Sequence, residues 1–175
     1  MDELTREVMK VKLLKQFPGL VAFPADDWSA QLTTAAKNVR FELKAAFPGV
    51  KFSVKTQRYT GGDSLNVAWT DGPTTKQVDA IIQKYQGGSF NGMEDYYEYG
   101  NNVFNDIFGD AKYVFANRSY SNALVAECIA KAVAEFGGEP ITVDDYRNGR
   151  AHYWSNGGGV DMGRELNVIM SETAK

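Results

Sequence analysis

Residues 50–70 read VKFSVKTQRYTGGDSLNVAWT, and this stretch decides the fold. Apolar and polar residues alternate strictly at 50–55 and again at 65–70. A period of two is typical of a β-strand that buries one of its faces. Gly61-Gly62-Asp63 supplies turn residues between the two runs. The stretch therefore predicts a long β-hairpin that turns these residues toward a core: Val50, Phe52, Val54, Leu65, Val67 and Trp69. Lys51 and Lys55 are expected on the opposite face.

Helical periodicity flanks the hairpin. Before it, apolar residues recur at helical spacing over residues 3–16 and from Trp28 or Ser29 to Ala46, and each run ends at Phe-Pro-Gly. The first run carries Leu4, Val8, Val11 and Leu14. After the hairpin, Thr74 and Gln77 form a capping box ahead of a helix that reaches Tyr85. A further helix is predicted from near Ser119 or Ser121 to Phe136, and strands are predicted at 94–99 and 112–118.

This order of elements predicts an α+β fold, an antiparallel sheet (the β-hairpin plus further strands) with helices packed on one face. We expect an N-terminal helix and linker at 1–27 and an α+β core domain at 28–138. A C-terminal extension at 139–175 would pack on or beside that core. Within the extension, Ile141–Val143 and Ala151–Trp154 are expected as short edge strands, and Arg164–Met170 as strand or helix.

Composition narrows the class of protein. The chain has 175 residues, a net charge of −3 and 43% hydrophobic residues, which suits one globular domain with or without an appended segment. We expect no transmembrane helix and no secretory signal. Cys128 is the one cysteine and His152 the one histidine. An internal disulfide and the usual structural zinc sites are therefore excluded, and a reducing cytoplasm is the expected compartment.

No catalytic constellation is evident, so we expect no catalytic residues, no bound cofactor and no metal site. Catalysis with a histidine base would have to use His152, which no catalytic signature surrounds. Cys128 lies on the predicted buried side of a helix, where a thiol is inert. The close carboxylates at Glu94-Asp95 with Glu98, and at Asp144-Asp145, do not match the spacing of a calcium loop. An enzyme centred on His152 is the least favoured hypothesis, but it stays open.

Charge is distributed unevenly along the chain. Residues 1–58 carry ten Lys/Arg and six Asp/Glu, a net of +4, whereas residues 59–117 carry three and eight, a net of −5. Lys51, Lys55 and Arg58 on the hairpin, with Lys44 and Arg40 on the preceding helix, could form a basic strip for nucleic acid. Tyr59 is the only aromatic residue close by in sequence. The alternative is a solubilising face that also discourages edge pairing.

An acidic, tyrosine-rich segment occupies the middle of the chain. Residues 90–99 read FNGMEDYYEY, and the predicted strand within them mixes acidic and tyrosine side chains. On an edge strand these residues would offer a contact surface to a protein. The predicted contact residues are Glu94, Asp95, Tyr96, Glu98 and Tyr99. Alternatively, the tyrosines pack beneath the last helix.

Several runs carry a family resemblance: residues 43–55, 67–78 and 88–93, and more loosely 97–99 and 112–121. They resemble a large polyvalent-protein-associated domain family of phages and conjugative elements, over about residues 36–136. The resemblance implies a phage, plasmid or integrated element as the setting and the cytoplasm of a bacterial host cell as the location. It implies no catalytic residues. Domains of this kind accompany counter-defence functions.

These observations lead to one hypothesis and one alternative. The first is a non-enzymatic accessory protein of a mobile element that binds a host defence protein or complex, as an inhibitor of anti-restriction or anti-CRISPR type. The alternative is a nucleic-acid-binding accessory of conjugative transfer or phage replication. Neither hypothesis involves a membrane, and the sequence leaves the oligomeric state open.

Overall fold

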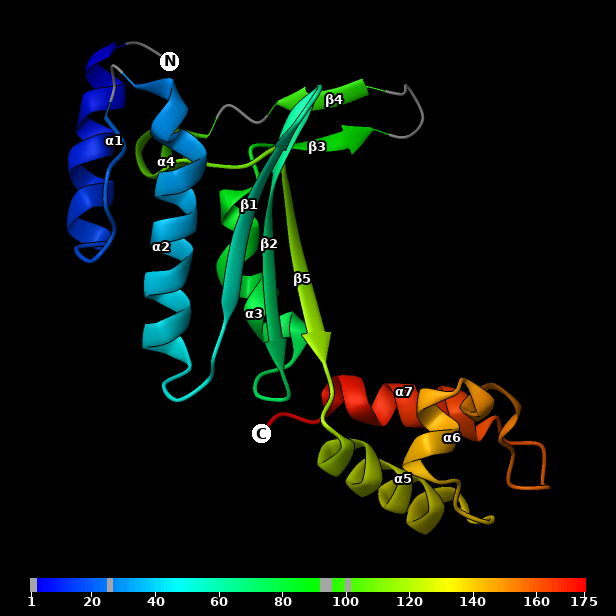
Figure 1. The fold of residues 1–175 in the computed structure, drawn as a ribbon. Coiled ribbons are helices and arrows are strands. Elements are labelled where there is room, and N and C mark those ends of the chain that lie inside the picture. The colour runs from blue at the N-terminus through cyan, green and yellow to red at the C-terminus, as the bar shows by residue number, and fades with distance from the viewer. Residues whose placement is uncertain (1–2, 25–26, 92–95, 100–101) are drawn as a thin grey trace. The chain divides into compact units, whose positions relative to one another are not determined.

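The computed structural model describes residues 3–24, 27–91, 96–99 and 102–175 (Figure 1). The chain divides into two compact units. Unit 1 comprises Met1–Trp69 and Lys76–Asn117, and unit 2 comprises Thr70–Thr75 and Arg118–Lys175. Each unit has its own cluster of buried apolar side chains. The three-part division at residues 27/28 and 138/139 stays a prediction.

A three-stranded sheet organises unit 1. Strands β1 (Ser53–Tyr59) and β2 (Gly62–Thr70) pair antiparallel, with Val54 opposite Val67, so the predicted hairpin is confirmed. Strand β5 (Tyr113–Ser119) lies on the other side of β2, giving the order β1-β2-β5. The arrows of β2 and β5 run in the same direction, so the sheet is mixed (Figure 1). The predicted α+β class is confirmed.

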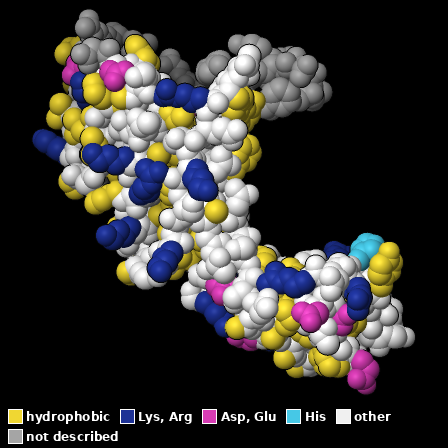
Figure 2. All heavy atoms as spheres, in the orientation of Figure 1, with side chains coloured by type: hydrophobic (Ala, Val, Ile, Leu, Met, Phe, Trp, Pro, Cys, Tyr) yellow, Lys and Arg dark blue, Asp and Glu magenta, His cyan; other side chains and the backbone are white. Residues whose placement is uncertain are grey.

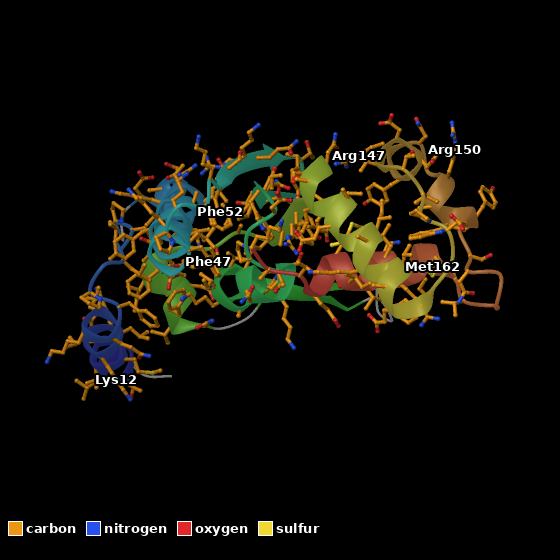
Figure 3. All side chains as sticks on the ribbon, turned by 90° about the horizontal axis from the view of Figure 1, so that it is seen from below. Lys12, Phe47, Phe52, Arg147, Arg150 and Met162 are labelled. Carbon is orange, nitrogen blue, oxygen red and sulfur yellow. The ribbon has the colours of Figure 1, made fainter. Side chains whose placement is uncertain are left out.

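Helices bury one face of this sheet. The helices of unit 1 are α1 (Glu3–Gln16), α2 (Gln31–Ala46), α3 (Thr75–Ile82) and α4 (Val103–Phe108), with 3-10 turns at Trp28–Ala30 and Gln83–Tyr85. Helix α2 packs on β1, whereas α1 packs against α4. Val39 and Leu43 of α2 share a face because they lie four residues apart, and both are fully buried. They pack with Leu65, Val67 and Trp69 of β2 in one cluster. Figure 3 shows Phe47 and Phe52 lying near each other, with ring centroids 6.0 Å apart.

A second, two-stranded sheet follows α3 in the chain. Strand β3 (Gly88–Asn91) pairs antiparallel with β4 (Tyr96–Tyr99), and Gly88 lies opposite Tyr99. The strand predicted at 94–99 is therefore present from Tyr96 onward in the part of the segment that the structure describes.

Unit 2 is helical. It contains α5 (Asn122–Phe136), α6 (Val143–Arg147), a 3-10 turn at Arg150–Tyr153 and α7 (Met162–Glu172). The helix predicted to start near Ser119 or Ser121 is present, and Ser121 is its N-cap, since the Ser121 hydroxyl accepts a hydrogen bond from the Leu124 amide at 3.2 Å. The stretch predicted as strand or helix at 164–170 is helix.

The edge strands predicted at Ile141–Val143 and Ala151–Trp154 are wrong. Thr142 and Asp145 form a capping box in which each side chain accepts from the other residue's backbone amide, and this pair starts α6. The second stretch forms the 3-10 turn, against which α7 packs closely. A Cβ on Gly163 of α7 would lie 2.0 Å from the Ala151 carbonyl oxygen, so the residue at this crossing has to be glycine.

Candidate functional site

The face of the sheet that points away from the helices is the strongest candidate site. Side chains alternate along a strand, so residues next to buried Val54 and Val114 point to this face. We call it the outer sheet face, and these residues of unit 1 define it: Lys55, Gln57 and Tyr59 of β1, Asn66 of β2, and Tyr113, Phe115 and Asn117 of β5. Phe115 is 47% exposed and Tyr59 is 44% exposed. Two large aromatic side chains on this face are thus about half open to solvent.

The aromatic side chains lie close together. The rings of Tyr113 and Phe115 are stacked, with centroids 6.2 Å apart and planes 16° from parallel. The Tyr59 hydroxyl donates to the Asp63 carbonyl oxygen at 3.2 Å. Partial desolvation, then the proximity of Tyr113 and Asp63, raises the pKa of Tyr59 above its ordinary value. The outer sheet face therefore joins aromatic residues from its first and last strands.

Lys112 places a positive charge beside these rings. Its Nζ lies 5.6 Å from the centroid of the Tyr113 ring and donates to the Gly61 carbonyl oxygen at 2.8 Å. Its backbone amide donates to Asp63 Oδ1 at 2.8 Å. A Cβ on Gly62 would lie 2.7 Å from Lys112 Cδ, so the side chain crosses the hairpin where glycine leaves room. The lysine is held against the aromatic group.

The predicted basic residues divide between two faces. Lys55 lies on the outer sheet face, and exposed Lys51 shares its alternation just before β1. Lys44 is exposed in the last turn of α2. Figure 2 shows Lys and Arg side chains spread over α2 and β1 in this view. Arg58 lies three residues from Lys55, hence on the opposite face, and its guanidinium donates to the Ser29 carbonyl oxygen.

The acidic, tyrosine-rich contact residues are described only in part. Glu94 and Asp95 lie outside the described residues. Tyr96, Glu98 and Tyr99 belong to β4, which pairs with β3, but their side chains lie outside what the structure describes. Their role as contact residues stays a prediction.

Sequence reasoning missed Lys112, Tyr113 and Phe115 as companions of the hairpin. They lie about 50 residues beyond it, and only the sheet order β1-β2-β5 brings them beside Tyr59. The alternation at 112–118 predicted a strand but not its neighbour. The signal available in the sequence was the alternation that puts neighbouring Val114 and Phe115 on opposite faces of a strand.

A carboxylate lies near the turn of the hairpin. Asp110 lines a cavity of about 310 Å³ together with Gln31, Asp63 and Lys112. Burial, then Asp63 and Asp106, raises the pKa of Asp110 to about 6. Within residues 3–24, 27–91, 96–99 and 102–175, no three His, Cys, Asp or Glu side chains are grouped to hold a metal ion.

His152 and Cys128 have different environments. His152 is exposed and lines an open groove of about 590 Å³ in unit 2. The other side chains along this groove are polar for the most part, among them Tyr146, Asp161, Arg164, Asn167 and Ser171. Cys128 is fully buried in the apolar cluster, and burial raises the pKa of its thiol above the ordinary value. Such a thiol is a poor nucleophile.

Comparisons with known proteins place the chain in a family. No match was found among curated proteins or among solved structures. In the described part of the chain, no helix has both the length and the apolar character needed to cross a bilayer. A family model, large polyvalent protein associated domain 29, matches residues 30–121, more than half of the chain. The match includes β1, β2 and β5 and therefore the outer sheet face. The chain belongs to this family, which associates it with the polyvalent proteins of phages and other mobile elements.

Proposed function

We propose that this protein is a non-enzymatic accessory of a mobile element that binds single-stranded nucleic acid across the outer sheet face of unit 1. The observation that supports the proposal is the group of Tyr59, Tyr113 and Phe115 on an open sheet, with Lys55 and Lys112 beside it. Surfaces that bind single strands without sequence preference combine aromatic rings with basic side chains in this way.

The aromatic rings would supply stacking. A base that stacks on an aromatic side chain contributes about 1–3 kcal/mol to binding. The rings of Tyr113 and Phe115 are nearly parallel, so they can orient successive bases alike. Because every base has a π face, binding through these rings should tolerate any sequence. In a duplex the bases are already stacked on each other, so a single strand should be preferred.

The lysines would supply phosphate contacts. Lys55 on the outer sheet face and Lys51 ahead of β1 are both exposed, whereas Lys44 lies on α2, on the other side of the sheet. Each phosphate that a lysine neutralises releases a counterion and makes binding weaken with salt, by about −0.7 in the logarithmic slope for single strands. Two such contacts predict a slope of about −1.4.

A second candidate function is the inhibition of a host defence protein or complex, of anti-restriction or anti-CRISPR type. Its contact residues would be Glu94, Asp95, Tyr96, Glu98 and Tyr99. Supporting it is β4, which belongs to a sheet of two strands. Each strand of such a pair has one edge that a partner strand can join by backbone hydrogen bonds. The family's mobile-element setting suits both candidates.

Fluorescence anisotropy with a labelled oligothymidylate of about 12 nucleotides, a length within the usual site sizes, tests the first candidate. The change Phe115→Ala should weaken binding about tenfold, since it removes one stacking ring. Tyr153→Ala is the matched control, because Tyr153 is an aromatic residue of unit 2 with 85% exposure. Its affinity should equal that of the wild type.

A salt titration gives the second arm. Lys55→Ala should make the logarithmic slope shallower by about 0.7. Lys76→Ala, an exposed lysine on α3, should not change it. The proposal would be contradicted if Phe115→Ala left the affinity unchanged and Lys55→Ala left the salt slope unchanged. Capture of a defined host complex after nuclease treatment, lost in a Glu94→Lys/Glu98→Lys variant, would move the assignment to the second candidate.

A further inference from the structure

Helix α1 has apolar residues on two opposite sides. Leu4, Val8 and Val11, which share one face by their spacing of four and three, are exposed to 77%, 62% and 52%. On the other side, Leu13 packs against the apolar cluster of unit 1, as does Phe17 just beyond the helix. We call the exposed set the outer stripe of α1.

The inward side fixes how α1 is oriented. The Phe17 ring meets the Phe104 ring edge to face with centroids 5.5 Å apart, and its amide donates to the Leu13 carbonyl oxygen at 2.9 Å. In a heptad that places Leu4 and Val11 at d and Val8 at a, Leu13 falls at f, opposite the stripe. The outer stripe cannot turn inward without breaking these contacts.

We propose that the outer stripe pairs with the outer stripe of a second copy of this chain, as a short parallel coiled coil. Exposed apolar side chains at a and d are the residues that such a seam buries. The flanking charges complement each other in this arrangement. Glu7 falls at g and Lys12 at e of the next heptad, so Glu7 of each copy faces Lys12 of the other.

The parallel direction follows from the same charges. In an antiparallel pair, e positions face e positions and g positions face g positions, which would bring Lys12 flanks together and separate them from Glu7. Only the parallel pair joins opposite charges twice. Within one chain, Glu7 and Lys10 are 3.7 Å apart on exposed side chains, a weak contact that Glu7 can exchange.

The expected affinity is low. Helix α1 has 14 residues, or about 21 Å of length, which is two heptads. Lys15 falls at the following a position, where two like charges would meet. A small interface of this kind suits a dissociation constant on the order of 100 µM. A second copy therefore joins when the protein is locally concentrated.

Sedimentation equilibrium of the full chain, up to a concentration of about 1 mM, tests the pairing. Val8→Lys should raise the dissociation constant at least about tenfold, because it puts a charge into the seam. Val168→Lys is the control, since Val168 is a comparably exposed valine on α7 of unit 2, and it should not change the constant. Circular dichroism should show that both variants stay folded.

Charge exchange tests the direction. Glu7→Lys alone and Lys12→Glu alone should each weaken self-association by about twofold to fivefold, and the double variant should restore it. Mixing the two single variants should give a mixed dimer that is tighter than either variant with itself. Lys15→Val should strengthen self-association several-fold. The proposal would be overturned if the chain stayed monomeric at about 1 mM. It would also be overturned if Val8→Lys did not change the dissociation constant, or if the double variant did not restore self-association.

Discussion

Each of the two units is stabilised internally by a different kind of contact. Unit 1 buries a large apolar cluster between its sheet and its helices. Unit 2 buries fewer apolar residues, mainly between α5 and α7. It is also stabilised by hydrogen bonds from side chains to backbone carbonyl oxygens. The difference teaches that apolar periodicity determines the fold of unit 1, whereas unit 2 depends on polar contacts that periodicity does not signal.

Arg118 donates most of the hydrogen bonds of this kind that are described below for unit 2. Its guanidinium donates to the carbonyl oxygens of Asp71 (2.9 Å), Gly72 (3.1 Å), Met170 (3.1 Å) and Thr173 (2.7 Å). One planar cation therefore joins the 70–75 segment to the end of α7. The Asp71 side chain in turn accepts from the Ser121 amide at 2.8 Å, just before α5 begins.

The largest expected effect is in the core of unit 1. Phe108 is fully buried, and its ring centroid lies 4.9 Å from that of Phe104. Phe108→Ala should lower the free energy of unfolding by about 3–5 kcal/mol, because it removes buried area and leaves a cavity. Hydrogen exchange should show faster exchange in α2 and β2, while α5 and α7 keep their protection.

Phe41→Ala is the matched control for that prediction, since Phe41 is half exposed on α2. It should cost about 1 kcal/mol, because the ring loses its contact with Gly19 but leaves no enclosed cavity. Equal loss of protection in both units after Phe108→Ala would show that they unfold as one, and the contrast between them would fail.

A somewhat smaller effect is expected in unit 2. Arg118→Ala should cost about 3 kcal/mol, because four carbonyl oxygens lose a charged donor. The loss should appear in α7 and around 70–75 by hydrogen exchange, with β1 and β2 up to Trp69 unaffected. Arg164→Ala removes an exposed arginine of α7 and should leave protection unchanged. If α7 kept wild-type protection in Arg118→Ala, the claim that the Arg118 hydrogen bonds stabilise unit 2 would be contradicted.

The smallest expected effect separates the units by pH. The pKa of Asp110 in unit 1 is raised to about 6, so the unfolded chain releases this proton at lower pH than the folded protein does. Its contribution to stability is present at low pH and is lost as pH rises from about 4 to about 6. Because Asp110 is partly accessible to solvent, we expect its pH-dependent contribution to the free energy of unfolding to be about 1 kcal/mol. Asp110→Asn should flatten the dependence of urea unfolding over this window.

Unit 2 should show the opposite sign. A hydrogen bond from the Thr142 hydroxyl holds the pKa of Asp145 below its ordinary value. The stability it contributes is present above the usual Asp pKa and is lost as pH falls below it. Asp145→Asn should reduce the loss of α6 protection below pH 4, a window in which Asp110→Asn should leave α6 unchanged.

The sequence predicted much of unit 1 and less of unit 2. Strict alternation around Val54 and Val67, and the helical stripe from Val78 to Tyr85, each report a local period that the buried face reproduces. The strand predicted at 141–143 failed because a capping box at Thr142 starts a helix there, which outweighs a short apolar run. The stretch at 151–154 forms a 3-10 turn that begins after Gly149 in a left-handed conformation. Arg118 gave no signal, because its carbonyl partners lie 46 to 55 residues away in the chain.

The sequence predicted the basic residues of the candidate site but not its aromatic residues on β5. Lys51 and Lys55 follow from alternation on one strand. Tyr113 and Phe115 join them only through the pairing of β5 with β2, a contact that the separate runs of sequence do not specify. Sheet order depends on how whole elements pack, so the aromatic half of the site required the structure.

The most direct measurement is photo-crosslinking of the full chain to an oligothymidylate that carries 4-thiothymidine, with crosslinked residues identified by mass spectrometry. If the outer sheet face binds single-stranded nucleic acid, the crosslinks will fall on Tyr59, Tyr113 and Phe115 and will fade as salt increases. Crosslinks that concentrate on residues 94–99 or on unit 2, with none on these three aromatic residues, would contradict that account.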